Sequence, residues 1–275
     1  MTTTGFLTDS TLCIGCKACE VACKEWNEIP GDGFAWSGLS YDNTGALGAS
    51  TWRHVKFVEG EFESGWGGNA PGQPPSWEYS SDVCKHCENA GCLEACPTGA
   101  IVRTEFGGVF VQPDVCNGCS YCVVSCPFGV VEKNPEDGRA FKCTFCYDRQ
   151  KAGMEPACAK ACPTESIKFG KLDYLREQAG ERLQALQARG IGDAQIYDPR
   201  ESSVGGIHAF FLVRGDPRAY NLPPDPEIPT VYLKPGWRSA AVGAGLLFLG
   251  TMAAFFSNRQ PSRGPREPAT GSHEN

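Results

Sequence analysis

Apolar residues recur along the chain with different periods, and each period predicts a different element. Residues 171–189 place an apolar side chain every three or four positions, which predicts an amphipathic helix ending before Gly190. The stretches TWRHVKFV (51–58) and HAFFLV (208–213) are rich in β-branched and aromatic residues and predict strands. These segments indicate an α+β chain. The expected apolar face of the helix consists of Leu172, Leu175, Ala179, Leu183 and Leu186.

The segment from Ala240 to Phe256 has no charged residue, and its length lies at the lower limit for crossing a bilayer, about 17–25 residues. It follows a proline-rich linker within residues 171–236 and precedes a polar tail, residues 259–275, so nothing remains to bury it. A buried core helix is the alternative interpretation. With its flanks, the segment predicts a single transmembrane helix over residues 237–258 that lies in a lipid bilayer.

Positive charges on both sides of this helix bear on its orientation. Arg259, Arg263 and Arg266 follow it, whereas Lys234 and Arg238 precede it. Because positively charged flanks are retained in the cytoplasm, the C-terminus is expected there and the bulk of the chain on the extracytoplasmic, periplasmic side. The stretch before the first cysteine has neither the basic nor the apolar region of a signal peptide.

Composition narrows the classes of protein to consider. The chain has 275 residues and a formal net charge of −7, whereas a nucleic-acid-binding domain is normally basic. Its 16 cysteines all fall in four short groups. Cysteines separated by two residues do not easily reach disulfide geometry, and their bond would close almost no loop. The clustering therefore indicates metal ligation.

Each cysteine group has the spacing of an iron–sulfur ligand loop: three cysteines, then a fourth after three intervening residues. In ferredoxins the fourth cysteine ligates the other cluster of a pair. It is expected to begin a helix, with a proline in the first turn, although Lys24 replaces that proline in the first group. Structural zinc sites instead combine two distant C-x2-C pairs, so four repeats favour [4Fe–4S] clusters over zinc. The other three groups are followed by Pro97, Pro127 and Pro163.

Sixteen ligands make four [4Fe–4S] clusters in two ferredoxin-like pairs. Proximity pairs the second cysteine group with the third, which leaves the first to pair with the fourth across the chain. Two nested units follow: residues 1–80 and 128–170, with a Trp- and Gly-rich insertion, form the first, and residues 81–127 form the second. The expected ligand sets are Cys13, Cys16, Cys19 and Cys162; Cys23, Cys143, Cys146 and Cys158; Cys84, Cys87, Cys92 and Cys126; and Cys96, Cys116, Cys119 and Cys122.

Residues beside the cysteines allow two interpretations. Positive charge next to a ligand would raise the reduction potential of a cluster, but lysines there are equally typical of a solvated surface. His86, between two ligands, is expected to pack, with donation to a cluster sulfur as the alternative. The sequence contains no nucleophile–base pair, phosphate loop or open metal position, so its chemistry is electron transfer. The lysines are Lys17, Lys24, Lys85, Lys142 and Lys160.

The chain resembles the iron–sulfur (beta) subunit of membrane-bound respiratory formate dehydrogenase. The resemblance runs from about Leu12 to the C-terminal helix and rests on CIGCKACEVACKEWN, CKHCENAGCLEACPTGAI, CNGCSYCVVSCPFG, KCTFCYDR, EPACAKACPT and VGGIHAFFLV. Beta subunits of many molybdopterin oxidoreductases share the cysteine frame, whereas ACEVACKEWN, VGGIH and the single helix are more particular to formate dehydrogenase. All four groups keep four cysteines, unlike nitrate reductase beta subunits, in which a Trp replaces one ligand.

The resemblance implies a non-catalytic subunit with two partners: a molybdenum- or tungsten-pterin alpha subunit that oxidises formate to CO2, and a membrane cytochrome b that passes electrons to quinone. Electrons would enter at the set of Cys13, pass to that of Cys143 and then to that of Cys84, and leave from that of Cys116 to haem b. Without a signal of its own, the subunit would cross the membrane with a signal-bearing partner.

Two alternatives keep the cysteine chemistry but change the function. The same relay could serve a hydrogenase, or a reductase of sulfur compounds or dimethyl sulfoxide. A metal-stabilised interaction module without a redox role is the second alternative, and the repeated cluster motif disfavours it.

Overall fold

The computed structural model describes residues 3–31, 42, 44–60 and 76–257. Residues 32–41, 43 and 61–75 of the Trp- and Gly-rich insertion lie outside the described residues, and so does the tail 259–275 with Arg259, Arg263 and Arg266. The chain divides into two units, Met1–Val231 and Tyr232–Asn275.

A four-stranded sheet organises the first unit, and the first strand of the chain lies inside it. The strands are β1 (Thr4–Asp9), β8 (Ile167–Lys171), β9 (Ala194–Tyr197) and β10 (Ala209–Arg214), in the order β8-β1-β10-β9. β1 is antiparallel to β8 and parallel to β10. Every residue of β10 is buried, which confirms the strand predicted over 208–213 to within one residue.

The two faces of this sheet border two different cores, because successive side chains of a strand point to opposite faces. Phe6 of β1 packs into a core that also contains cysteines, while Leu7 packs into the core beneath α6 (Leu172–Ala188). Helix α6 buries four residues of the predicted apolar face, and Leu183 packs against them in part. The helix ends as predicted, at Gly190, whose φ is +85°.

A β-hairpin lies between the first two cysteine groups. Its strands β2 (Arg53–Gly60) and β3 (Ser76–Val83) are antiparallel, with Arg53 opposite Val83. Strand β2 confirms the strand predicted over 51–58. Strand β3 was not predicted, because SWEYSSDV is largely polar, and it leads directly into Cys84.

Short helices accompany the cysteine groups, but not where the sequence predicted them. In each group the third cysteine lies within a helix, and in the last three groups the fourth follows the helix end. The prediction that the fourth cysteine begins a helix is therefore wrong. Each proline stands three residues past the last helical residue, where it prevents the helix from continuing. The helices are α1 (Ala18–Trp26), α2 (Gly91–Glu94), α3 (Tyr121–Val124), α4 (Tyr147–Lys151) and α5 (Ala157–Lys160).

The replacement of proline by Lys24 has a direct structural effect in the first group. Because lysine keeps its backbone N–H and fits a helix interior, α1 continues past Cys23 to Trp26. The indole nitrogen of Trp26 then donates to Asp148 at 2.7 Å, and its ring lies 4.2 Å from the guanidinium of Arg149. The extension therefore links the first cysteine group to α4.

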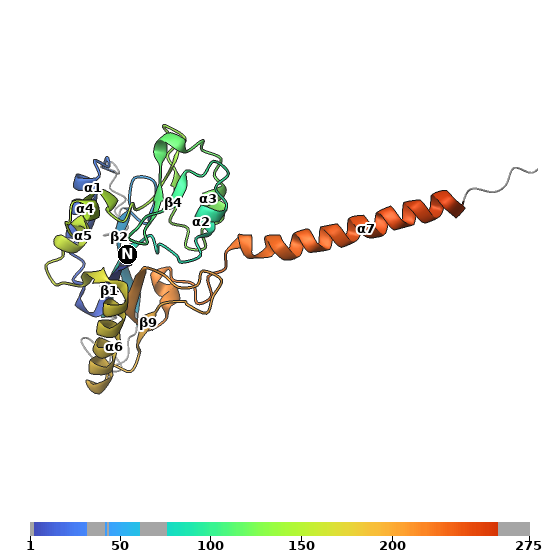
Figure 1. Ribbon diagram of the computed structural model, residues 1–275. Helices are drawn as coiled ribbons and strands as arrows, with labels where there is room; N and C mark the ends of the chain where they lie inside the picture. The colour runs from blue at the N-terminus through green and yellow to red at the C-terminus, as the bar shows by residue number, and fades with distance from the viewer. Residues whose placement is uncertain (1–2, 32–41, 43, 61–75, 258–275) are drawn as a thin grey trace, which may run out of the picture. The chain divides into compact units, whose positions relative to one another are not determined.

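The short helices gather in two places within the first unit (Figure 1). Helices α1 and α5 contact one another beside α4, and α2 contacts α3 and β4. Segments distant in sequence thus lie together: α1 precedes the hairpin, whereas α4 and α5 follow both central cysteine groups. The remaining two-stranded sheets pair β4 (Ile101–Arg103) with β5 (Val109–Val111) and β6 (Glu132–Lys133) with β7 (Ala140–Phe141).

The second unit is one long helix, α7 (Leu233–Ser257). It contains 25 residues, which at 1.5 Å each extend about 37 Å and exceed a hydrocarbon core of about 30 Å. Its apolar side chains are exposed, including Leu246, Leu247 and Phe248. In the part of the chain that the structure describes, it is the one helix long and apolar enough to cross a membrane. It begins four residues before the predicted span.

Candidate metal centres

The four cysteine loops share a backbone feature at the same position. The second residue after the first cysteine has a positive φ in every loop: +69° at Gly15, +46° at His86, +71° at Gly118 and +63° at Phe145. This left-handed turn costs a non-glycine residue about 1–2 kcal/mol. The same bend in all four loops indicates that all four are built to present their sulfurs alike.

Packing offsets that strain at Phe145. Its ring is fully buried and lies 5.1 Å from the ring of Phe6, edge to face, so the loop is fastened to β1. His86 packs 4.4 Å from Phe145, and its Nδ1 accepts a hydrogen bond from the backbone N–H of Val109 at 3.0 Å. Burial lowers the pKa of His86 well below its usual value, so the ring is neutral. The ring therefore packs as predicted, and donation from Nε2 to a cluster sulfur stays the alternative.

The structure brings the sixteen cysteines together in four sets of four. Three of the sets each line a small cavity, with thiols from separate parts of the chain. In the remaining set, three thiols lie near Cys23. Burial is the main cause that raises the pKa of Cys23, and these three thiols raise it further. The cavity sets are Cys13, Cys16, Cys19 and Cys162; Cys84, Cys87, Cys92 and Cys126; and Cys96, Cys116, Cys119 and Cys122. The neighbours of Cys23 are Cys143, Cys146 and Cys158.

Exposure differs among the four sets. Cys16 and Cys119 are the exposed cysteines, and they belong to the first and last of the predicted sets. The set of Cys23 is buried completely, and that of Cys84 is buried or half-buried. The two central sets are therefore shielded from water, while each outer set reaches the surface through one thiol.

The donor atoms fit a multi-iron group better than a single ion. Within the described ranges, no three Cys, His, Asp or Glu side chains converge on a point that one metal ion could occupy. A zinc ion would need its sulfurs about 2.3 Å away, whereas these thiols lie around the walls of a cavity. Two buried nitrogens beside the cysteines, Nε of Arg53 and Nε2 of His86, have no hydrogen-bond partner among the described residues. Unsatisfied buried donors are rare and are consistent with a sulfur-rich group beside them.

Burial sets the protonation of these thiols. It raises the pKa of Cys19 and of Cys92 to about 12, and that of Cys122 and of Cys146 to about 11. A thiol with such a pKa stays protonated at neutral pH unless positive charge compensates the thiolate. Ligation by iron supplies that charge, and binding releases the protons.

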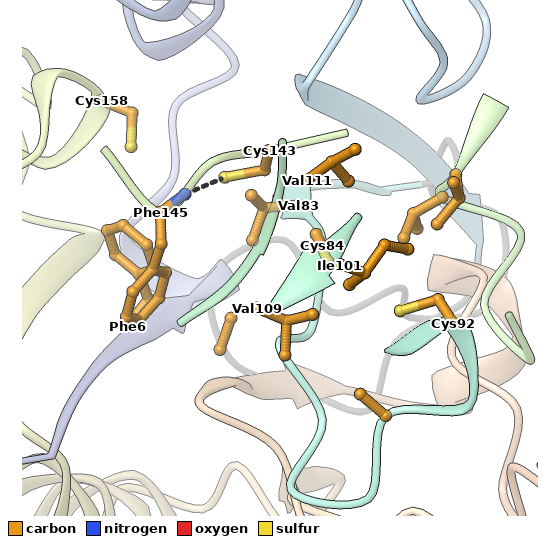
Figure 2. Close-up of a cluster of buried hydrophobic side chains, with 14 of the residues drawn as sticks. Phe6, Val83, Cys84, Cys92, Ile101, Val109, Val111, Cys143, Phe145 and Cys158 are labelled. Atoms are coloured by element: carbon orange, nitrogen blue, oxygen red, sulfur yellow. Dashed lines mark hydrogen bonds between the residues drawn. The ribbon is translucent and has the colours of Figure 1, made fainter. Parts of the chain in front are cut away.

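Several sulfurs accept hydrogen bonds from outside their own sets. The Ser81 hydroxyl lies 3.1 Å from Sγ of Cys19, and the backbone N–H of Phe145 donates to Sγ of Cys143 at 3.3 Å (Figure 2). The backbone N–H of Ala140 donates to Cys116 at 3.5 Å. Hydrogen bonds to ligand sulfurs are one of the factors that set the reduction potential of a cluster.

The five lysines beside ligands differ in exposure, which separates those that could act on a cluster from those on a solvated surface. Lys85 and Lys142 are buried, Lys160 is exposed, and the other two are half-buried. Lys85 is paired with Asp82, so its charge is compensated locally. Among the described residues, the hydrogen bonds of the Lys142 ammonium go to carbonyl oxygens, those of Val109 and Cys143.

Sequence reasoning missed Arg53, which is 1% exposed and donates to Sγ of Cys158 at 3.2 Å. A signal was present, because Arg53 shares the strand face of Val55 and Phe57 and so points inward with them. Charged residues were considered only next to cysteines in sequence, whereas Arg53 reaches a cysteine 105 positions away.

Comparison with known proteins gives consistent relatives. Two family models described as 4Fe-4S dicluster domain match residues 12–100 and 75–172. The formate dehydrogenase iron-sulfur subunit of Haemophilus influenzae is 41% identical over 261 residues, covering 91% of this chain and 79% of the relative. The formate dehydrogenase-O iron-sulfur subunit of Escherichia coli is 42% identical over 255 residues, covering 90% and 80%. A thiosulfate reductase electron transfer subunit of Salmonella typhi is 37% identical over 205 residues, covering 74% and 89%.

Proposed function

Because the chain belongs to the family of formate dehydrogenase iron–sulfur subunits, we propose that it relays electrons from a formate-oxidising catalytic subunit to a membrane-bound acceptor. The chain is an electron-transfer subunit rather than a catalytic one, and it holds four [4Fe–4S] clusters. The observation that carries the proposal is the gathering of sixteen thiols into four sets of four. When bound, the clusters accept and release single electrons.

Each set of four thiols is proposed to ligate one cluster. The ligand sets are the four described above, so every cysteine is used and no iron keeps an open position for substrate. The surrounding chain holds the sulfurs by the left-handed loop turns and shields the two central sets from water. Low local dielectric strengthens the hydrogen bonds that these sulfurs accept.

We propose a nested arrangement of the two dicluster units. The contact between α1 and α5 supports it, because these helices carry Cys19 and Cys158 from the two ends of the cysteine region. The contact between α2 and α3 supports the inner unit in the same way. The proposed boundaries are residues 1–80 with 128–170 for the outer unit and 81–127 for the inner unit.

The pattern of exposure supports a linear relay with its ends at the surface. Cys16 marks the end proposed to meet the catalytic subunit, and Cys119 marks the end proposed to meet a membrane cytochrome b. Clusters that exchange electrons only with other clusters of the same chain need no access to solvent. The two central thiol sets have little such access. The proposed catalytic partner carries a molybdenum- or tungsten-pterin site, and the proposed final acceptor is quinone.

Helix α7 is proposed to anchor the complex in the membrane. Its length and apolar surface support this role, as does the family of respiratory enzymes to which the relatives belong. The extracytoplasmic position of the first unit, with a cytoplasmic C-terminus, is part of the proposal and rests on the charges that flank the helix.

A second candidate function is the same relay in a reductase of sulfur compounds, which the similarity to the thiosulfate reductase subunit supports. That match covers 74% of the chain, whereas the formate dehydrogenase relatives cover about 90% at higher identity. Formate dehydrogenase is therefore the better supported partner.

Purification with the natural partner subunits tests the proposal. We expect four clusters in this chain by iron analysis, EPR signals from interacting reduced clusters after dithionite, and quinone reduction that depends on formate. A complex that is inactive with formate but active with thiosulfate would support the second candidate. Absence of the EPR signals would instead support a redox-inactive metal module.

A further inference from the structure

Arg53 lies between two of the thiol sets. It begins β2, is 1% exposed and donates from one terminal nitrogen to Sγ of Cys158 at 3.2 Å. Its other terminal nitrogen donates to the carbonyl oxygen of Ser81 at 3.1 Å, and the Ser81 hydroxyl lies 3.1 Å from Sγ of Cys19. The guanidinium is therefore the middle of a polar connection between the set of Cys19 and the set of Cys158.

The charge of Arg53 has no carboxylate partner in the part of the chain that the structure describes. Other buried cations of this chain do: Lys85 pairs with Asp82, and Arg214 pairs with Glu78 at 3.1 Å. A buried charge is strongly destabilising unless it is paired. The group beside Arg53 that can supply a compensating negative charge is the thiol of a proposed ligand, Cys158, whose sulfur lies 3.2 Å from the guanidinium.

Lys142 repeats this arrangement one step along the relay. Its side chain is buried, and its ammonium donates to the carbonyl oxygens of Val109 and Cys143. Val109 lines the cavity of the Cys84 set and Cys143 belongs to the neighbouring set, so the ammonium lies between the two sets. Figure 2 shows Cys143 and Cys84 close to Val83, at the junction where the outer and inner cysteine groups meet.

We propose that Arg53 and Lys142 are positioning residues for electron transfer, each of which holds one positive charge between two neighbouring clusters and raises the reduction potentials of both. This inference rests on the proposed function, since it requires clusters at the four thiol sets. Each accepted electron adds one negative charge to a cluster, and a buried cation stabilises that charge strongly because the local dielectric is low. Placing the cation between two clusters lets one residue act on both.

A purely structural role is the competing explanation, in which the cations only neutralise thiolates so that the chain can fold around its clusters. The two roles predict different effects of a substitution on cluster content and on reduction potentials. Loss of a structural cation lowers cluster content, whereas loss of a tuning cation leaves the clusters in place and moves their potentials.

The test is an EPR-monitored redox titration of the intact complex carrying Arg53→Met, Arg53→Lys or Lys142→Met, each with its iron content. Lys160→Met is the matched control, because Lys160 also lies beside ligands but is exposed. We expect Arg53→Met to make the reduction potentials of two clusters more negative, those of the Cys19 and Cys158 sets. Arg53→Lys keeps the positive charge, so we expect its potentials to stay close to those of the unmodified complex. We expect Lys142→Met to shift the clusters of the Cys143 and Cys84 sets, and the control to shift none.

Arg53→Met with full iron content and unchanged potentials would overturn the inference. Should that variant lose iron, Lys142→Met tests the same proposal independently, and unchanged potentials there would also overturn it. Loss of iron from both neutral variants would overturn it in favour of the structural role. Failure of the proposed function is distinguishable, because it would already be visible in the unmodified complex as missing cluster signals.

Discussion

The hydroxyl oxygen of Ser81 lies 3.1 Å from the sulfur of Cys19, although the two residues are 62 positions apart. Ser81 belongs to β3, in a hairpin that contains no cysteine, and Cys19 belongs to α1. The hairpin therefore contributes to the surroundings of a proposed cluster without contributing a ligand.

Ser81→Ala should make the potential of the cluster of Cys13, Cys16, Cys19 and Cys162 more negative. Loss of one buried hydrogen bond of about 1 kcal/mol corresponds to a shift of roughly 40 mV for a one-electron couple. Redox titration by EPR measures it. Ser80→Ala is the control, because Ser80 is also buried but points to the opposite face of β3. Equal shifts in both variants would contradict the prediction.

Double cysteine variants should reveal the nested ligand sets. Cys13→Ala and Cys23→Ala, although only ten residues apart, are predicted to damage different clusters, so the double variant should lose the iron of two clusters. Cys13→Ala with Cys162→Ala should lose the iron of only one cluster, although the two residues are 149 positions apart. Iron analysis and EPR spin counting measure both. The opposite pattern would show that Cys13 and Cys23 share a cluster.

Two glycines with similar backbone conformations should respond differently to alanine. Gly118 and Gly99 have φ of +71° and +68°, so alanine at either is strained by about 1–2 kcal/mol. A Cβ at Gly118 would also overlap the carbonyl oxygen of Gly138, whereas one at Gly99 meets nothing within 4 Å. Gly118→Ala should therefore release iron to a chelator several-fold faster than Gly99→Ala, measured by loss of visible absorbance. Equal rates would exclude the steric contribution.

Glu78 should make stability depend on pH. Burial raises the pKa of Glu78 to about 7, against the opposing effect of Arg214, and the nearby Asp193 and Asp9 raise it further. The folded state binds the proton of Glu78 more tightly than the unfolded state does. The contribution of this proton to the free energy of unfolding is therefore complete below about pH 4.5 and is lost as pH rises to about 7. The slope reaches at most about 1.4 kcal/mol per pH unit.

Glu78→Gln removes the titrating group, so its apparent Tm should fall less than that of the unmodified protein between pH 5.5 and 7.5. Thermal unfolding of the loaded protein at several pH values measures the difference. Parallel curves for the two proteins would show that Glu78 does not titrate in this range.

Leu247→Arg should weaken membrane attachment. Leu247 lies near the middle of the uncharged segment of α7, where arginine costs about 2.5–3.5 kcal/mol on insertion. Ser239→Arg, at the edge of that segment, should have little effect, because the side chain reaches the interface. The fraction of protein retained in carbonate-washed membranes measures both. Equal retention would mean that α7 is not inserted.

The four ligand sets stay a prediction from cysteine spacing; the fold supports it by placing the same thiols near one another. Spacing could suggest these sets because ligand loops are local and their pairing leaves few alternatives. The amphipathic helix over 171–189 was predictable for a related reason, since its apolar period is regular. Both inferences start from patterns that are local in sequence, the spacing within each cysteine group and the apolar period of the helix.

The surroundings of the cysteines were not predictable in the same way. Arg53 and Ser81 reach sulfurs only through the register of β2 and β3, and β3 has no apolar alternation to reveal it. The helix positions were wrong because the prolines were interpreted as first-turn residues, whereas they follow the helix ends. The positive φ at His86 and Phe145 could not be predicted either, since this conformation is uncommon for residues other than glycine.

Strand β1 has both of its neighbours, β8 and β10, at the far end of the first unit. It is translated before the other described strands, yet one edge has no partner until residues 167–171 are made, and the other has none until residues 209–212 are made. An unpaired strand edge is a site where chains aggregate and where cellular quality control acts. A nascent chain that stops before Ala209 therefore keeps one edge of β1 open, so this edge is covered only after most of the first unit has been translated.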